Sequence, residues 1–398
     1  MAVRPDQPPV PAFRADSSPE RLADELLLTL ARPRLTQEVC ARVRDVLGTH
    51  GAGLDWGRFV DLAGRHGVLP LVGRNLIRHR LAQSDEGRPL APYRWIYSYA
   101  YEGNRRRNQA LADEYAKVLR AVDDAGIAYA IRKGQPLVDT VYGDPGARRV
   151  GDLDLLLRRD TLARVADALT DLGYAQGRQS QNGERIEPFD RRTQLFWRTK
   201  LTNVALPFVK LSHRDDVELF IIDPCTSLFQ VSSGVEADVG DFLDRRVRRT
   251  VYGEPSFVMD RTDQLIDACV QLHVEATTLY YIEIGKDLTL LKFLELAELL
   301  RAADEDVAEE FRRRVDVYDC AGSVAWALHH TALLYPDAVP AALADGFPVA
   351  DAATLDEYGA FDGQVHRWES DFTTRLFDPA RNKDVTARSN VPGPRAAV

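Results

Sequence analysis

Apolar residues recur every three or four positions over the first hundred residues, which is the spacing of one buried face of a helix. The leucines between Leu22 and Leu30 form the first such face, in a helix that begins near Pro19. Similar spacing predicts further helices over residues 36–47, 56–63 and 68–81. This part of the chain therefore predicts an all-helical region over residues 19–103.

The pattern changes after a long amphipathic helix, which we expect over residues 104–125. A short apolar run at 127–131 and an alternating run at 150–157 predict two strands, and the turn-rich sequence YGDPGARR before the second one predicts a flexible loop. Two more runs, at 204–211 and 217–222, flank the polar turn SHRDD and predict a hairpin.

The order of these elements predicts an α+β fold, in which a mixed sheet is flanked by helical regions on its N-terminal and C-terminal sides. The predicted segments are a flexible N-terminus at 1–18, a helical region at 19–103, a sheet-bearing core at 104–260, a C-terminal helical region at 261–380 and a disordered tail at 381–398.

The composition narrows the class of protein. The chain of 398 residues has a formal net charge of −9, which predicts no broad basic surface and no nucleic acid as a partner. No run approaches the roughly 18 apolar residues of a membrane span, and the first residues lack the apolar segment of a secretory signal. We therefore expect a soluble, cytoplasmic protein without a membrane partner, which acts on a small molecule or a peptide.

The candidate chemistry centres on the sequence VGDLDLLL. Side chains alternate across a strand, so Asp152 and Asp154 point to one face, about 6.6 Å apart along the backbone, while Leu153 and Leu155 point into the core. Two carboxylates at this spacing can share magnesium ions, and an acidic pair on an apolar strand is costly to bury without a cation. The alternative is an edge strand with a solvated acidic face.

The chain contains, in order, WGRFVDLAGRHGVLPLV, AGIAYAIRKGQPLVDTVYG, RRVGDLDLLL, DLGY, QLHVEA and LTLLKFLELAELL. In this order and spacing the stretches resemble the uncharacterised nucleotidyltransferases of the polymerase-beta-like superfamily, over roughly residues 22–300. The resemblance implies a mixed sheet in which Asp152 and Asp154 are catalytic residues and ligands of Mg²⁺.

The resemblance also implies a third carboxylate on a later strand, in a pattern like Asp-Leu-His. The matching place reads VELF, so Glu218 would be the third catalytic and metal-binding residue. This departs from the family's pattern, because the longer glutamate side chain shifts the metal or the general-base geometry. Asp216 and Asp223 remain alternatives, and Asp223 faces the other side from Glu218 on a regular strand. Glu218 would otherwise be an exposed strand residue.

Five residues are candidates for nucleotide binding. Where the superfamily has Gly-Ser after its first core strand, this chain has Lys133 and Gly134; the glycine would let backbone amides approach a triphosphate, and the lysine would supply charge. Arg149, just before the acidic strand, would meet phosphate or pair with an aspartate. His273 and Lys286, in the late helices, would lie on the nucleotide or acceptor side, or else in the core and at the surface respectively.

Together these features predict a transferase that moves NMP from an NTP co-substrate, expected to be ATP, to a small-molecule or peptide acceptor and releases pyrophosphate. Two magnesium ions about 3.5–4 Å apart would stabilise the charge at the α-phosphorus. An adenylate intermediate of a biosynthetic pathway is one form of such a product. The alternatives are a non-catalytic nucleotide- or partner-binding protein on the same fold and a transferase that modifies a protein or tRNA. The sequence leaves the oligomeric state open.

Overall fold

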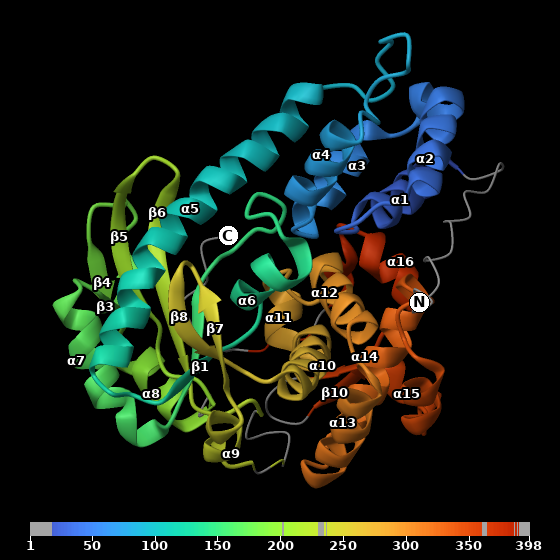
Figure 1. Cartoon of the computed structure of the whole chain (residues 1–398). Coiled ribbons are helices and arrows are strands. Elements are labelled where there is room, and N and C mark those ends of the chain that lie inside the picture. Colours follow the sequence, from blue (N-terminus) through green and yellow to red (C-terminus); the bar gives the residue numbers. More distant parts are fainter. Residues whose placement is uncertain are drawn as a thin grey trace, which may run out of the picture.

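The computed structural model describes residues 18–200, 203–229, 235, 237–359, 364–385, 387 and 389. Figure 1 shows a sheet with a long helix, α5, lying across it, beside a lobe of helices to which both ends of the chain contribute. No helix in the described part of the chain is long and apolar enough to cross a membrane.

The N-terminal helices lie where the apolar spacing predicts them. They are α1 (Pro19–Leu30), α2 (Gln37–His50), α3 (Trp56–Arg65) and α4 (Leu69–Arg78), with the short 3₁₀ turn η1 (Gly51–Gly53) after α2. Ser18 and Thr36 cap the first two helices, because each side chain accepts a hydrogen bond from a backbone N–H of the first turn. Of the N-terminus that we expected to be flexible, residues 1–17 lie outside the described part.

Helix α5 (Arg94–Asp124) begins ten residues before the predicted start at residue 104. Its first turns carry Trp95 and Tyr99, which are 59% and 71% exposed, so no apolar stripe marks them as a helix in the sequence. Helix α5 contacts α4 near its start and packs on the sheet further along (Figure 1). It therefore spans the expected boundary between the helical region and the core.

The sheet has eight strands in the order β4-β3-β5-β6-β2-β1-β8-β7. They are β1 (Tyr129–Ile131), β2 (Leu153–Leu157), β3 (Ala175–Gln179), β4 (Ile186–Pro188), β5 (Phe208–Arg214), β6 (Val217–Cys225), β7 (Val247–Val251) and β8 (Glu254–Val258). The β2–β6 and β1–β8 pairs are parallel and the others are antiparallel. The predicted α+β fold with a mixed sheet and the β5–β6 hairpin are confirmed, whereas β3, β4, β7 and β8 were not predicted.

Short helices connect the strands: α6 (Gln135–Leu137) continuing into the π-helical turn η2 (Val138–Tyr142), η3 (Arg159–Thr161) leading into α7 (Leu162–Asp171), α8 (Arg191–Lys200) and α9 (Val239–Asp244). The C-terminal helices are α10 (Arg261–Thr277), α11 (Leu279–Glu283), α12 (Leu290–Arg301), α13 (Glu305–Val317), α14 (Ala321–Leu334), α15 (Ala341–Gly346) and α16 (Phe372–Phe377). The 3₁₀ helix η5 (Ala352–Asp356) and the small hairpin β9 (Glu357–Gly359) and β10 (Val365–Arg367) lie among them.

The expected disordered tail is partly a structural element. Residues Arg381–Asp384 form the 3₁₀ helix η6, and the Arg381 guanidinium donates hydrogen bonds of 2.9 and 2.7 Å to the buried Asp287 carboxylate. A buried charge pair of this kind holds both segments in place, because neither charge tolerates burial alone. The prediction of disorder from residue 381 is therefore wrong for residues 381–385, and beyond these the structure describes only residues 387 and 389 of the tail.

Two apolar cores organise the molecule. One packs α5 and α7 against the sheet, through residues such as Tyr115, Val118 and Leu155. The other contains buried residues of both the N-terminal and the C-terminal helices, such as Leu71 and Leu294. The two helical regions that we expected on either side of the core therefore form one lobe, which we call the helical lobe. Helix α12 of this lobe contacts η2, in the segment that follows β1.

Candidate active site

Three aspartates meet at the edge where β2 and β6 lie side by side. Asp154 on β2 is in register with Asp223 on the parallel strand β6. Asp152 comes directly before β2, two residues ahead of Asp154, so the pleat turns both side chains to one face. Leu153 and Leu155, of opposite parity, are fully buried in the core under α5. The predicted sidedness of the strand is confirmed. We call Asp152, Asp154 and Asp223 the acidic cluster.

The acidic cluster faces the helical lobe. Leu156 shares the face of Asp154, and it belongs to the core that joins the N-terminal and C-terminal helices. Asp154 is only 2% exposed. The carboxylates therefore stand in the seam between the sheet and the helical lobe rather than on a solvated edge, which excludes the edge-strand interpretation.

The burial and close approach of the three carboxyl groups shift the pKa of each. Burial raises the pKa of Asp223 well above its usual range, and the neighbouring Asp152 and Asp154 carboxylates raise it further. Burial also raises the pKa of Asp154. For Asp152, burial is outweighed by Lys133 and by a hydrogen bond with the Asp223 carboxyl group, so its pKa is lowered. Three acidic groups this close need a cation or a proton among them.

Lys133 supplies one cation. Its Nζ donates a hydrogen bond of 2.6 Å to Asp154 Oδ1. Burial lowers the pKa of Lys133, but the Asp154 carboxylate and other neighbouring groups, Asp152 among them, together raise it by more, so the lysine is charged. The backbone of Lys133 is left-handed, with φ of 57°, which is uncommon for a residue with a side chain. Since 34% of the side chain remains accessible, the ion pair is open to exchange with solvent ions.

Gly134, a predicted nucleotide-binding residue, is packed closely against a neighbouring side chain. A Cβ at this position would lie 1.7 Å from Arg148 Nη2, so the glycine makes room for a guanidinium. Arg148 in turn pairs with Glu295 of α12, with one hydrogen bond of 3.2 Å to Oε2. The structure thus shows Gly134 as a packing position between the β1 loop and the helical lobe. Next to it, Gln135 donates through Nε2 to the backbone oxygen of Asp152, while its buried Oε1 has no partner.

The loop before β2 is held rather than flexible. Asn104 Nδ2 donates to the backbone oxygens of Gly146 and Arg148, at 2.9 Å each. Asn108 Nδ2 donates to Arg148 O at 2.6 Å, and Tyr115 Oη donates to Gly151 O at 2.9 Å. All three side chains come from α5, so one helix fixes the backbone that leads into the acidic cluster. The expectation of a flexible loop, which its turn-forming residues suggested, is wrong.

Two further lysines approach from the helical lobe. Lys286, a predicted site residue, lies close enough to Asp152 to lower its pKa. Lys292 Nζ donates a hydrogen bond of 3.2 Å to Lys286 O and contacts Glu275. Burial lowers the pKa of Lys292 to about 7, Lys133 lowers it as well, and Asp152 opposes both. Lys292 was not predicted, although a lysine inside the apolar run LLKFLELAELL was a visible signal.

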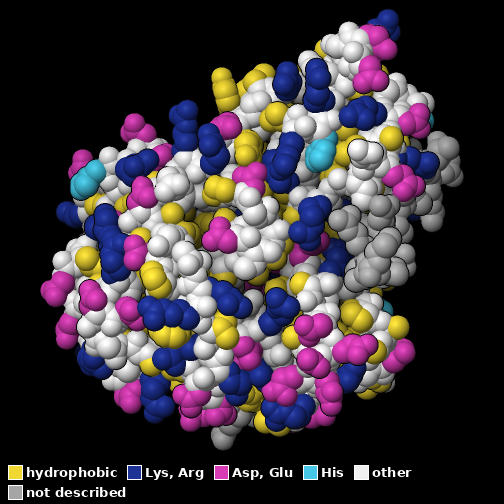
Figure 2. Space-filling model, viewed as in Figure 1, with side chains coloured by type: hydrophobic (Ala, Val, Ile, Leu, Met, Phe, Trp, Pro, Cys, Tyr) yellow, Lys and Arg dark blue, Asp and Glu magenta, His cyan; other side chains and the backbone are white. Residues whose placement is uncertain are grey.

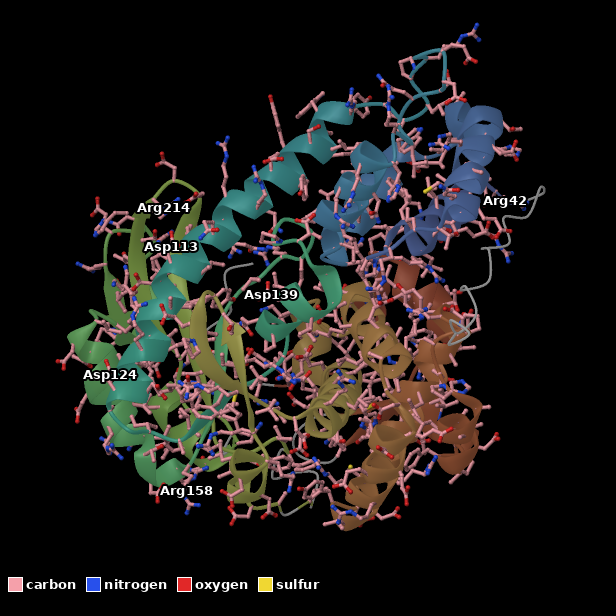
Figure 3. All side chains as sticks on the ribbon, viewed as in Figure 1. Arg42, Asp113, Asp124, Asp139, Arg158 and Arg214 are labelled. Atoms are coloured by element: carbon pink, nitrogen blue, oxygen red, sulfur yellow. The ribbon has the colours of Figure 1, made fainter. Side chains whose placement is uncertain are left out.

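Glu218, which we predicted as the third carboxylate, does not reach the acidic cluster. It is exposed, and it precedes the part of β6 that pairs with β2, which begins at Ile222. The five residue rises from Glu218 to Asp223 span about 16 Å of strand. The alternative Asp216 is paired with Arg214 at 2.8 Å, and Arg214 lies at the tip of the β5–β6 hairpin (Figure 3). Of the three possibilities, the structure brings only Asp223 to Asp152 and Asp154.

His273 and Arg149 are not brought into contact with the acidic cluster. His273 shares a hydrogen bond of 2.9 Å between Nδ1 and Ser323 Oγ, and burial lowers its pKa to about 4. It lines a separate cavity in the helical lobe. Arg149 is exposed, and among the described contacts only its backbone oxygen is engaged, by the Arg148 side chain at 3.0 Å.

The donor set suits a hard divalent cation, since carboxylate and amide oxygens are the ligands that Mg²⁺ prefers. The unpartnered Gln135 Oε1 beside Asp152 adds a fourth such oxygen. As they stand, however, no three His, Cys, Asp or Glu side chains of the described residues are arranged to hold a metal ion. The Lys133 ammonium is bound to the Asp154 carboxylate, and the Asp152 and Asp223 side chains share a hydrogen bond. The residues fit Mg²⁺ chemically, and a bound ion would require Lys133 to release Asp154.

Comparison with known proteins adds one match. The model of an uncharacterised nucleotidyltransferase family matches residues 52–336 of this chain. The matched range contains the acidic cluster, the β1 loop, Lys286 in the connection between α11 and α12, and helix α12, which carries Lys292. The comparison with curated proteins finds no match.

Proposed function

Since the chain belongs to this uncharacterised nucleotidyltransferase family, we propose that it transfers the NMP group of an NTP to an acceptor and releases pyrophosphate. The observation that carries the proposal is the register of Asp154 with Asp223 on adjacent parallel strands, with Asp152 on the same face and lysines opposite. Three carboxylates provide for two cations, and the lysines suit a polyphosphate. We propose ATP as the donor and a small molecule or a peptide as the acceptor.

The residues divide the work in the following way. Asp152, Asp154 and Asp223 would hold Mg²⁺, which supplies positive charge at the α-phosphate when it is bound. Lys133, once released from Asp154, binds phosphate oxygens of the NTP. Lys286 and Lys292 approach from the opposite lobe and bind the leaving pyrophosphate. This arrangement works by position and charge and needs no covalent intermediate on the protein.

The bond changes balance in a single displacement. An acceptor oxygen attacks the α-phosphorus and forms the new P–O bond, while the bond from the α-phosphorus to the α,β-bridging oxygen breaks. The electron pair leaves with pyrophosphate. The Asp223 carboxylate, in register with Asp154 on the neighbouring strand, accepts the acceptor's proton.

The test is pyrophosphate release from each of the four NTPs with Mg²⁺ and a pool of small-molecule and peptide acceptors. The double variant Asp152→Asn/Asp154→Asn should abolish release. Asp160→Asn/Asp167→Asn is a matched control, because both of these aspartates are exposed on the segment after β2. Folding of all variants is checked by circular dichroism.

Other outcomes favour other functions. Binding of an NTP without pyrophosphate release, by wild-type protein, would support a nucleotide-binding protein on the same fold. Transfer of label from the α-phosphate to protein or tRNA, but not to the small-molecule pool, would show a macromolecular acceptor. The same pyrophosphate release from wild type and the double variant would refute the assignment of the acidic cluster.

A further inference from the structure

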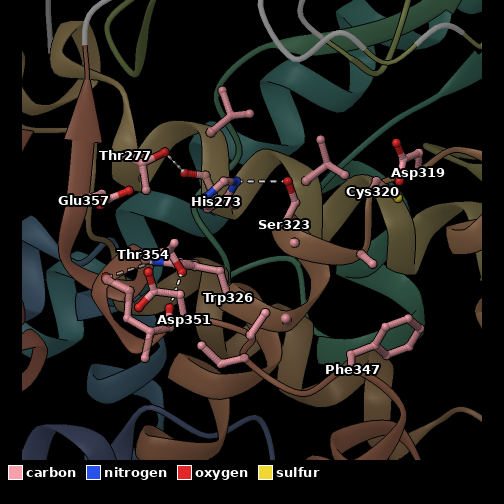
Figure 4. A pocket seen from close by; sticks show the side chains of 18 of the residues that line it. His273, Thr277, Asp319, Cys320, Ser323, Trp326, Phe347, Asp351, Thr354 and Glu357 are labelled. Carbon is pink, nitrogen blue, oxygen red and sulfur yellow. Dashed lines mark hydrogen bonds between the residues drawn. The ribbon is translucent and has the colours of Figure 1, made fainter. Parts of the chain in front are cut away.

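A cavity lies largely within the helical lobe. It has a volume of about 1010 Å³ and is lined by α10, α14 and the segment from Gly346 to Gly359 (Figure 4). None of Asp152, Asp154 or Asp223 lines it. Its size matches sites that bind small organic molecules, which range from about 300 to 1,000 Å³. The cavity is therefore separate from the acidic cluster and large enough for a ligand of its own.

Flat and apolar side chains form much of its wall. Trp326, Phe347 and His273 line it (Figure 4), and Phe229 is a further lining residue. The Trp326 Nε1 is already engaged with Leu355 O at 3.2 Å, so the indole offers its ring rather than a donor. His273 is neutral at physiological pH, because burial lowers its pKa to about 4. These walls favour a flat, largely apolar molecule.

The charged side chains that line the cavity, among the described residues, are all acidic. Its charged lining residues, among those described, are Asp319, Asp351 and Glu357, with no lysine or arginine. Glu357 is paired with Arg367 at 2.8 Å, outside the lining. Asp319 and Asp351 have no ion pair among the described contacts. Two exposed carboxylates without an ion pair, on a wall that also carries aromatic rings, attract a cation and repel a phosphate or a carboxylate.

We propose that this cavity binds an organic cation with a flat apolar body. We also propose that the cation is the acceptor of the transferase, and this second role rests on the proposed function. One turn connects the two places: Thr277 and Thr278 line the cavity, and Tyr281 lies within electrostatic range of Lys133 and Asp223. The junction of α10 and α11 thus borders the cavity at Thr277 and Thr278 and comes near the acidic cluster at Tyr281.

The binding test uses three fluorescent probes that share a dansyl group. Dansylcadaverine carries a primary amine, dansylamide is neutral and dansylglycine is an anion. Titration of the full chain should give the tightest binding for dansylcadaverine, weaker binding for dansylamide and the weakest for dansylglycine. A difference of about tenfold between cation and anion corresponds to about 1.4 kcal/mol. Equal affinities, or a preference for the anion, would overturn the proposal.

Asp319→Asn/Asp351→Asn removes the two charges with little change in shape. Asp351 caps η5 through a hydrogen bond to Ala353 N, which asparagine also makes. Asp319 has φ of 48°, which asparagine tolerates. The variant should lose about tenfold in affinity for dansylcadaverine and nothing for dansylamide. Asp304→Asn, at the N-cap of α13, is the control and should change neither. If both probes respond alike, the charges do not select the ligand.

The acceptor role has its own test. The acceptor pool is separated on cation-exchange and anion-exchange resins, and each fraction is added to wild-type protein with Mg²⁺ and ATP. Acceptor-dependent pyrophosphate release should follow the cation-exchange fraction. Release with the anion fraction alone would overturn the acceptor role and leave the dansyl result intact. Absence of pyrophosphate release with every fraction would count against the proposed function. The dansyl titration would still show whether the cavity binds an organic cation.

Discussion

The Lys133 ammonium and the Asp154 carboxylate are joined by a hydrogen bond of 2.6 Å, so a lysine stands where the proposed reaction requires a metal ion. The lysine comes from the loop after β1 and the aspartate from the adjacent strand β2. Lys133 is paired in this way from a left-handed backbone conformation. The pair neutralises Asp154 in the absence of a cation and leaves a charged side chain ready for phosphate once a cation arrives.

Replacement of this lysine should separate metal binding from nucleotide binding. Lys133→Met should bind Mn²⁺ severalfold more tightly than wild type when no nucleotide is present, since the loss of a partly exposed ion pair is worth about 1 kcal/mol. The same variant should bind ATP more weakly. Titration of Mn²⁺ by electron paramagnetic resonance measures the first effect and calorimetry measures the second. Lys117→Met, on the exposed side of α5, is the control. Weaker Mn²⁺ binding by Lys133→Met would contradict the proposal that Lys133 and the metal ion compete for Asp154.

The identity of the third carboxylate is decided by two variants on one strand. Asp223→Asn should lower the rate of pyrophosphate release by at least about 100-fold, because a metal site contributes several kcal/mol to the transition state. Glu218→Gln should leave the rate within about twofold, as surface substitutions away from a site usually do. A large loss in Glu218→Gln with an active Asp223→Asn would restore the assignment made from the sequence pattern alone.

Lys292 should give nucleotide binding a dependence on pH near neutrality. Its pKa is lowered to about 7, so it is charged below that pH and neutral above it. The affinity for ATP should therefore fall severalfold between about pH 6 and pH 8 as this charge is lost. Lys292→Arg keeps its charge over this range, and its affinity should change less with pH. Calorimetry at constant ionic strength measures both proteins, and identical pH profiles would exclude Lys292 as the source.

Replacement by alanine should change the stability of the protein at one of two glycines near the acidic cluster and not at the other. Gly134→Ala should lower the free energy of unfolding by about 1–3 kcal/mol, because its Cβ would overlap the Arg148 guanidinium held by Glu295. Gly151→Ala should be tolerated, since nothing lies within 4 Å of its Cβ position. Chemical denaturation compares the two variants with wild type. Equal stability of both would mean that Arg148 moves aside freely.

The parts of the site that were predictable depend on local spacing. The alternation of VGDLDLLL placed Asp152 and Asp154 on one face, and β2 confirms that face. The position of Asp223 depends on the parallel register of β6 with β2, which spacing along the chain does not contain. Glu218 was chosen by analogy with a family pattern. That choice failed because β6 runs to Cys225 and meets β2 only at its end.

The helical segments show the same limit. Apolar stripes predicted α1 to α4 within a few residues, because each buries one face. The joining of the N-terminal and C-terminal helices into one lobe depends on contacts between distant parts of the chain, such as Leu290 N donating to His66 Nδ1 at 3.2 Å. The ordered position of Arg381 could not be predicted for the same reason, because its partner Asp287 lies far away in the sequence.

The most direct test of the central claim follows the phosphates of ATP separately. Wild-type protein is incubated with Mg²⁺, the acceptor pool and ATP labelled either in the α-phosphate or in the γ-phosphate. Nucleotidyl transfer at the acidic cluster predicts that the α-label moves to the acceptor, that the γ-label appears in pyrophosphate, and that both changes are lost in Asp223→Asn. Transfer of the γ-label to the acceptor, or transfer of the α-label that persists in Asp223→Asn, would contradict the account.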